Sequence, residues 1–79
     1  MAQDLRPAAD RAFEAVGRLK LGTWEGVEAA AVLAWSCPSH PDSRQLLTRA
    51  ATASTTLKAG TWESVRALAW LAKAQRELA

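Results

Sequence analysis

The 79-residue sequence has one cysteine and one histidine, and it contains no tyrosine, isoleucine or asparagine. One cysteine excludes an internal disulfide framework, and one histidine with one cysteine excludes the standard zinc sites. The longest apolar run, residues 29–35, is too short to cross a bilayer. The charged N-terminus lacks the apolar region of a secretory signal. We therefore expect a cytoplasmic protein that does not enter a membrane.

Alanine and leucine dominate what is present, with eighteen Ala and ten Leu against four Val. Alanine and leucine lead the helix-propensity scale, whereas the β-branched residues that favour strands are scarce. A chain of this length supports one small hydrophobic core. The composition therefore predicts a single all-α domain over residues 1–79.

An internal repeat is the strongest pattern in the chain. The segment LKLGTWEGV at 19–27 returns as LKAGTWESV at 57–65, which is 38 positions later. The same offset lays residues 4–41 over residues 42–79 with 16 identities in 38 positions. The sequence therefore predicts two tandem copies of one unit, repeat one over 4–41 and repeat two over 42–79.

Each repeat has the pattern of an αα-hairpin, with Asp4 capping the first helix and Gly22 ending it in the left-handed conformation. Thr23 then caps the second helix, which stops at Cys37-Pro38, and the last helix begins after Thr61. Two amphipathic hairpins can bury their apolar faces against each other. We predict a compact, pseudo-symmetric four-helix bundle.

Catalytic and metal-binding patterns are missing. His40 lies in a linker between prolines, where we expect it to be exposed, and Cys37 lies at a helix C-terminus, which does not activate a thiol. Glu25 and Glu28 have the spacing of a carboxylate metal site but lack its histidine. The sequence thus predicts a protein that is not an enzyme and that has no catalytic residues, metal site or cofactor.

The four tryptophans indicate a binding surface instead. On a helical projection, Trp62 shares an apolar arc with Val65, Leu68, Ala69, Leu71, Ala72 and Leu78, so we expect Trp24 and Trp62 to lock the hairpin turns. Trp70 falls among charged residues, where an exposed indole is typical of an interface hot spot. The predicted protein-binding face of the second and fourth helices comprises Trp70, Arg66, Lys73, Val32, Trp35, Glu25 and Glu28.

Three hypotheses for function follow. The favoured one is a non-catalytic protein-binding module, a small regulator or inhibitor that attaches to a larger protein assembly. The first alternative is a basic nucleic-acid-binding domain, since the pI is about 9.2 and the expected third helix carries Arg44, Arg49 and Lys58. The second is a self-assembling structural subunit or homodimer, because oligomerisation offsets the marginal stability of a small core.

Overall fold

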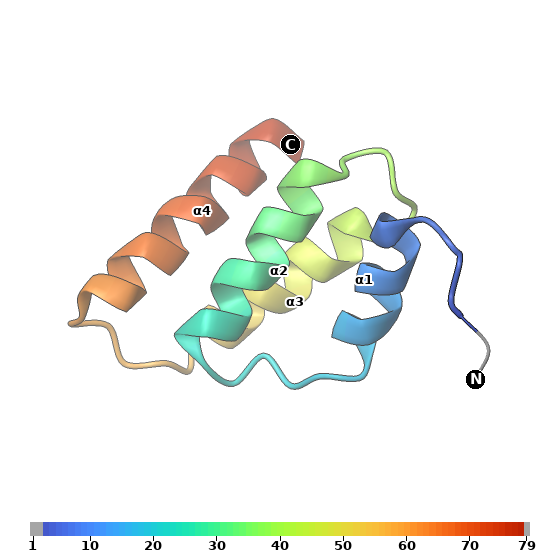
Figure 1. Ribbon diagram of the computed structural model, residues 1–79. Coiled ribbons are helices and arrows are strands. Elements are labelled where there is room, and N and C mark those ends of the chain that lie inside the picture. Colours follow the sequence, from blue (N-terminus) through green and yellow to red (C-terminus); the bar gives the residue numbers. More distant parts are fainter. Residues whose placement is uncertain (1–2, 79) are drawn as a thin grey trace.

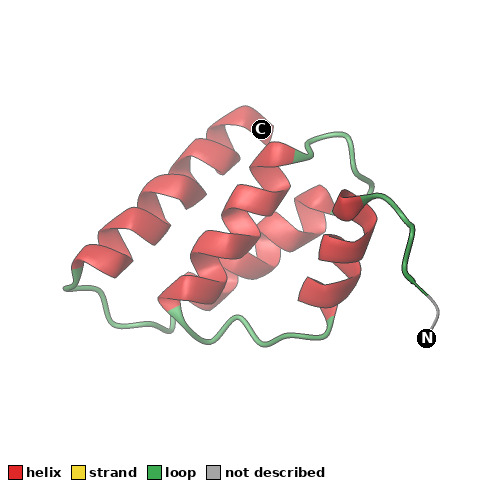
Figure 2. Ribbon diagram, viewed as in Figure 1, coloured by secondary structure: helices red, strands yellow, loops and turns green. Residues whose placement is uncertain are grey.

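The computed structural model describes residues 3–78, which form four helices and no strand (Figures 1 and 2). The helices are α1 (Ala8–Gly17), α2 (Trp24–Ser36), α3 (Ser43–Ser54) and α4 (Trp62–Leu78). The predicted all-α fold with four compactly packed helices is confirmed. No helix within this part of the chain is long and apolar enough to cross a membrane.

Threonine side chains begin α2 and α4, as their position before each helix predicts. The Thr23 Oγ1 accepts a hydrogen bond from the Gly26 N–H at 3.1 Å, and the Thr61 Oγ1 accepts one from the Ser64 N–H at 3.1 Å. Each contact satisfies an N–H that has no partner within its own helix. The two helices therefore start in the same way at equivalent positions of the sequence.

The start and end of α1 differ from the prediction. Asp4 does not cap this helix, because its carboxylate binds the Arg6 side chain and α1 begins only at Ala8, after Pro7. The helix ends at Gly17, where glycine lowers helix stability, and does not extend to Gly22. Gly22 is not left-handed, since Gly60 alone among the described residues has a positive φ, at 142°.

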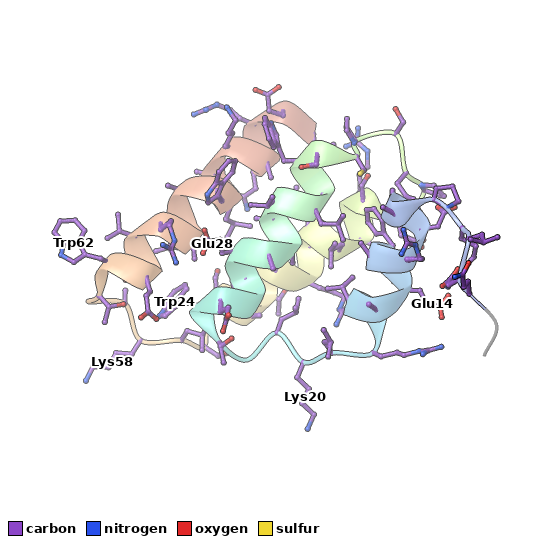
Figure 3. All side chains as sticks on the ribbon, in the orientation of Figure 1. Glu14, Lys20, Trp24, Glu28, Lys58 and Trp62 are labelled. Carbon is purple, nitrogen blue, oxygen red and sulfur yellow. The ribbon has the colours of Figure 1, made fainter. Side chains whose placement is uncertain are left out.

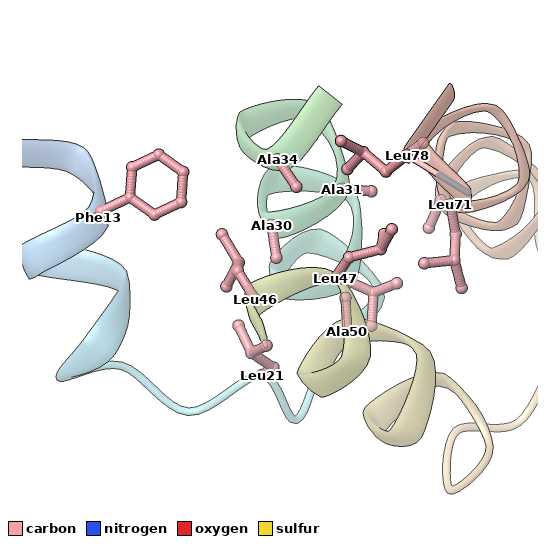
Figure 4. Packing of buried hydrophobic residues seen from close by; sticks show 13 residues of the cluster. Phe13, Leu21, Ala30, Ala31, Ala34, Leu46, Leu47, Ala50, Leu71 and Leu78 are labelled. Atoms are coloured by element: carbon pink, nitrogen blue, oxygen red, sulfur yellow. The ribbon is translucent and has the colours of Figure 1, made fainter. Parts of the chain in front are cut away.

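The centre of the fold is α2, which packs against each of the other three helices. The alanines and valine on its inner side are fully buried, and small side chains allow helix axes to approach closely. Leucines of α3 and α4 fill the space around them (Figure 4). The fully enclosed side chains of α2 are Val27, Ala30, Ala31 and Ala34.

The predicted pseudo-symmetry is not confirmed by the packing. A twofold axis between the repeats would exchange α1 with α3 and α2 with α4. The contact between α2 and α3 would then have a counterpart between α4 and α1. In the structure, α3 packs against both α2 and α4, whereas the backbone of α1 comes close to α2 alone among the helices of residues 3–78. Figure 1 shows α1 and α4 on opposite sides of the α2–α3 pair.

The buried face of α4 is not the one that the projection selected. The fold buries Leu71 and Leu78 as expected, but it leaves Val65 and Leu68 exposed and encloses Ser64 and two alanines, Ala67 and Ala74, in their place. Trp62 does not lock a turn: 87% of its surface is exposed. The reason is that α4 lies at the edge of the molecule and needs only one narrow side for its contacts with α2 and α3.

Candidate protein-binding surface

Most of the predicted binding residues meet along the seam between α2 and α4, which we define by Trp35, Trp70, Lys73, Arg66 and Glu28. The rings of Trp35 and Trp70 lie 5.5 Å apart between centroids at an interplanar angle of 52°. The Lys73 ammonium lies 5.0 Å from the centroid of the Trp35 ring, a cation–π contact. The seam therefore joins aromatic and basic side chains from two helices that the chain places next to each other.

Trp70 is less accessible than the sequence suggested. Its indole is half-buried and packs against the hydrophobic core as well as against Trp35. The charged arc on which it is projected borders α2, where Arg66 contacts Glu28 and Lys73 contacts Trp35. Much of the Trp70 surface is consequently used to hold the two helices together, and only part of it remains for another molecule.

An ion pair continues the seam toward the N-terminal ends of α2 and α4. The Arg66 Nε donates to the Glu28 carboxylate, with both carboxylate oxygens 3.0 Å away. Glu28 lies between the two helices in Figure 3, and it lines a hollow of about 240 Å³ together with Glu25. Because Arg66 remains largely exposed, this pair adds little to stability but fixes the charges at the surface.

The remaining predicted residue, Val32, lies on α2 but takes no part in the aromatic contacts. It is half-buried and lines a shallow hollow of about 450 Å³ with Glu25 and Glu28. Glu25 and Glu28 line both hollows, so these two carboxylates connect Val32 to the Arg66 end of the seam.

An exposed apolar row on α4 was not expected from the sequence. The outer stripe of α4, defined here as Trp62, Val65, Leu68, Ala69 and Ala72, is exposed throughout. Trp62 projects away from the other helices in Figure 3. Exposed apolar residues that form a continuous row mark interaction sites more often than isolated ones do.

The helical spacing did contain the signal for this stripe. In α4 the residues Ala67, Leu71, Ala74 and Leu78 form one apolar row, and the outer stripe forms a second. A helix with two apolar rows can bury either of them. The spacing alone does not show which of the two rows is buried, because that depends on where α2 and α3 lie.

The basic residues of the nucleic-acid alternative lie apart and serve the fold. Arg44 donates a hydrogen bond to the Leu78 carbonyl at the end of α4. Arg49 donates to the Leu19 carbonyl at 3.3 Å, while the exposed Lys58 lies in the loop before α4 (Figure 3). These three cations do not form one patch.

Beside Arg49 are two adjoining hollows of about 500 and 480 Å³, between α3, α1 and the loop after α1. Leu21 and Thr48 line the first, and Phe13 and Leu46 line the second. The charged side chains that line the second are those of Asp42 and Arg49.

His40 is not the exposed linker residue that the sequence indicated. Its ring stacks on Phe13 with centroids 3.8 Å apart and planes 6° apart. The His40 Nδ1 accepts a hydrogen bond from the Asp42 N–H, and Nε2 lies 3.3 Å from the Asp10 carboxylate. These contacts connect α1 to the loop before α3. Residues 3–78 contain no group of three His, Cys, Asp or Glu side chains that could hold a metal ion.

Comparison of the chain with protein-family models, with curated proteins and with solved structures gives no match in any of the three.

Proposed function

We propose that the protein is a non-catalytic module that binds another protein through the exposed side of α2 and α4. The observation that carries this proposal is the outer stripe of α4, where Trp62 is 87% and Val65 is 56% exposed. Keeping a tryptophan in water forgoes the stabilisation that its burial would give. Such a residue is best explained by a partner that covers it.

The charges beside the stripe suit this role. Arg66 and Lys73 belong to the seam beside the stripe, and each is already held in place by a contact to α2. Charges held in place at the rim of an interface increase the association rate and the specificity for one partner more than they increase affinity. We therefore assign Trp62 as the anchor, with Arg66, Lys73 and the accessible edge of Trp70 around it.

We also propose that residues 4–41 and 42–79 are duplicated copies of one helical hairpin. The matching start of α2 and α4, each capped by the threonine of a Gly-Thr-Trp-Glu segment, supports this origin. In this view the second copy keeps the sequence of a packing helix but presents one of its faces to solvent.

The proposal is tested by capture of partners from a lysate of cells that express the protein. The baits are the unmodified chain, Trp62→Glu, and a matched control, Leu5→Glu. Leu5 is also an exposed apolar residue, at 84%, but it lies in the segment before α1. We expect Trp62→Glu to lose a specific partner by roughly 30-fold or more, as for a hot-spot residue, with an unchanged circular dichroism spectrum. Retention of every partner by Trp62→Glu would refute the proposed surface.

A further inference from the structure

The outer stripe of α4 is complementary to itself, and we infer that its partner is a second copy of this chain. This inference rests on the proposed function and names the occupant of the same surface. Two copies would pack α4 against α4 in antiparallel orientation, related by a twofold axis that passes beside Ala69. The arrangement leaves α1, α2 and α3 as they are in the single chain.

The same stripe occurs on α2, where helices of this molecule already cover it. Trp24, Val27, Ala31 and Ala34 match Trp62, Val65, Ala69 and Ala72 residue for residue, 38 positions apart. On α2 the valine and both alanines are fully buried.

On α2, this row of side chains is covered because the helix packs against α3 and α4. The Trp24 indole at the start of the row is held by a hydrogen bond that it donates to the Lys58 carbonyl at 3.0 Å. This combination of side chains is therefore one on which helices pack in this protein. On α4 it is left without a helix.

Antiparallel pairing matches large side chains to small or basic ones. Residues at equal distances on either side of Ala69 face each other across a twofold axis, because each residue advances a helix by about 1.5 Å. Ala69 then meets Ala69 of the other copy, Trp62 meets Arg76, and Val65 lies opposite Lys73, beside Ala72. The alanines at the centre allow the two helices to approach closely. At each end of the helix pair, the Trp62 indole of one copy contacts the Arg76 guanidinium of the other.

Charge selects antiparallel over parallel packing. In a parallel pair, Lys73 would lie beside Lys73 and Arg76 beside Arg76 of the other copy. In the antiparallel pair, these cations lie near the opposite end of α4, which carries Glu63 and the Trp62 ring. Arg66 does approach Lys73 of the other copy, but the Glu28 carboxylate already neutralises Arg66 at 3.0 Å. The complementary contacts thus outnumber the repulsive one.

The area available indicates a weak dimer. Burying Trp62 removes on the order of 200 Å² of apolar surface per copy. With the rest of the stripe and its rim, the two copies together would bury roughly 1,000 Å², at the lower limit for specific interfaces. Association is therefore expected at high protein concentration and not at trace amounts.

The first test is sedimentation equilibrium from about 10 µM to about 1 mM, where small interfaces associate. The mass of the unmodified chain should rise from 8.5 kDa toward twice that value. Ala69→Glu should remain at 8.5 kDa at every concentration. This glutamate suits the helix of the single chain because Arg66 and Lys73 lie three and four residues away.

The matched control is Ala15→Glu, at an exposed alanine of α1 that also has arginines three and four residues away, Arg18 and Arg11. This variant should associate like the unmodified chain. Loss of association in Ala15→Glu but not in Ala69→Glu, or growth beyond a dimer, would overturn the inference, since open growth indicates head-to-tail packing.

The second test is disulfide cross-linking in a Cys37→Ser background, which is informative even if Ala69→Glu fails to fold. Two Ala69→Cys residues lie at the axis and should form a cross-linked dimer. Two Val65→Cys residues would lie about 12 Å apart along the helices, beyond the roughly 7 Å that a disulfide spans. Cross-linking at 65 and not at 69 would contradict antiparallel pairing.

The two proposals can fail separately. A chain that stays monomeric at about 1 mM, without a 69–69 cross-link, overturns the second-copy inference. If that monomer still captures another protein through Trp62, the proposed function stands and its partner is a different protein. If Trp62→Glu changes neither capture nor mass, both proposals are wrong.

Discussion

Three charged side chains, Asp4, Arg6 and Glu14, connect the segment before α1 to that helix. The Arg6 guanidinium donates to both oxygens of the Asp4 carboxylate, at 2.9 and 2.7 Å, and also contacts Glu14. The hydrogen bonds from Arg6 lower the pKa of Asp4 from its ordinary value of 3.8 to about 2, and they lower the pKa of Glu14 as well. All three side chains remain largely exposed, so the network orders the segment more than it stabilises the fold.

The lowered pKa values give a prediction at this scale. Because folding lowers the pKa of Asp4, its contribution to stability is present above the unfolded value near 3.8 and is lost as pH falls through about 2. An NMR titration of the Asp4 carboxyl carbon should report a pKa of about 2 in the unmodified chain. In Arg6→Gln the Asp4 pKa should return to its ordinary range. An ordinary value in the unmodified chain would show that this pair does not form in solution.

A second residue-scale difference distinguishes the two turns that precede α2 and α4. The repeat places Gly26 opposite Ser64. A side chain at Gly26 would meet the Leu21 backbone at 3.2 Å, whereas the buried Ser64 Oγ accepts hydrogen bonds from the N–H groups of Gly60 and Thr61. The first turn is closed by backbone packing and the second by a hydroxyl.

Among the helices, α1 has the weakest attachment. It has ten residues, too few to be stable alone, and Phe13 is its single buried side chain. Figure 4 shows Phe13 set apart from the leucines and alanines of the other helices. Its stacking partner, His40, comes from the loop between α2 and α3. The stability of α1 therefore depends on one ring pair, the half-buried Val16 and a few polar contacts.

This weak attachment predicts uneven hydrogen exchange. Amides of α1 should exchange at least about tenfold faster than those in the middle of α2, because local opening of α1 exposes little buried surface. Phe13→Ala should remove the protection of α1 and leave α2 and α4 protected, whereas Leu5→Ala should change neither. Equal protection of all four helices would mean that α1 unfolds only together with the rest of the molecule.

At the scale of the whole molecule, position decides how similar helices are used. The central helix α2 is covered by its neighbours on several sides, whereas α4 at the edge is covered on one (Figure 1). Trp24 is half-buried and donates to the Lys58 carbonyl, which ties the start of α2 to the loop before α4. Trp62, at the equivalent position of the repeat, packs against no part of the core.

The two tryptophans should therefore differ in their effect on stability. Trp24→Ala is expected to lower the free energy of unfolding by about 2–4 kcal/mol, through lost packing and a lost hydrogen bond. Trp62→Ala should change it by no more than about 0.5 kcal/mol, as for an exposed side chain. Urea unfolding at low protein concentration measures both values without a contribution from association. Equal losses would show that Trp62 is buried in solution.

The candidate surface was predictable in part. The helical projection places Trp70, Arg66 and Lys73 on one face with Trp35 and Glu28 of the preceding hairpin, and the fold brings these five side chains together along one seam. Trp62 could not be selected, because it belongs to one of two apolar rows on the same helix. A pattern of spacing identifies such rows but does not show which one a neighbouring helix will cover.

The sequence by itself determined that the chain is helical and where α2 and α4 begin, since alanine and leucine content and the threonine caps act locally along the chain. It did not determine which face of each helix is buried against which neighbouring helix. The tertiary structure decided that α2 is buried on several sides, that α4 lies at the edge, and that Trp24 and Trp62 meet different surroundings. The physical reason is that burial depends on all the neighbours of a side chain, and identical local sequences have different neighbours in one asymmetric packing.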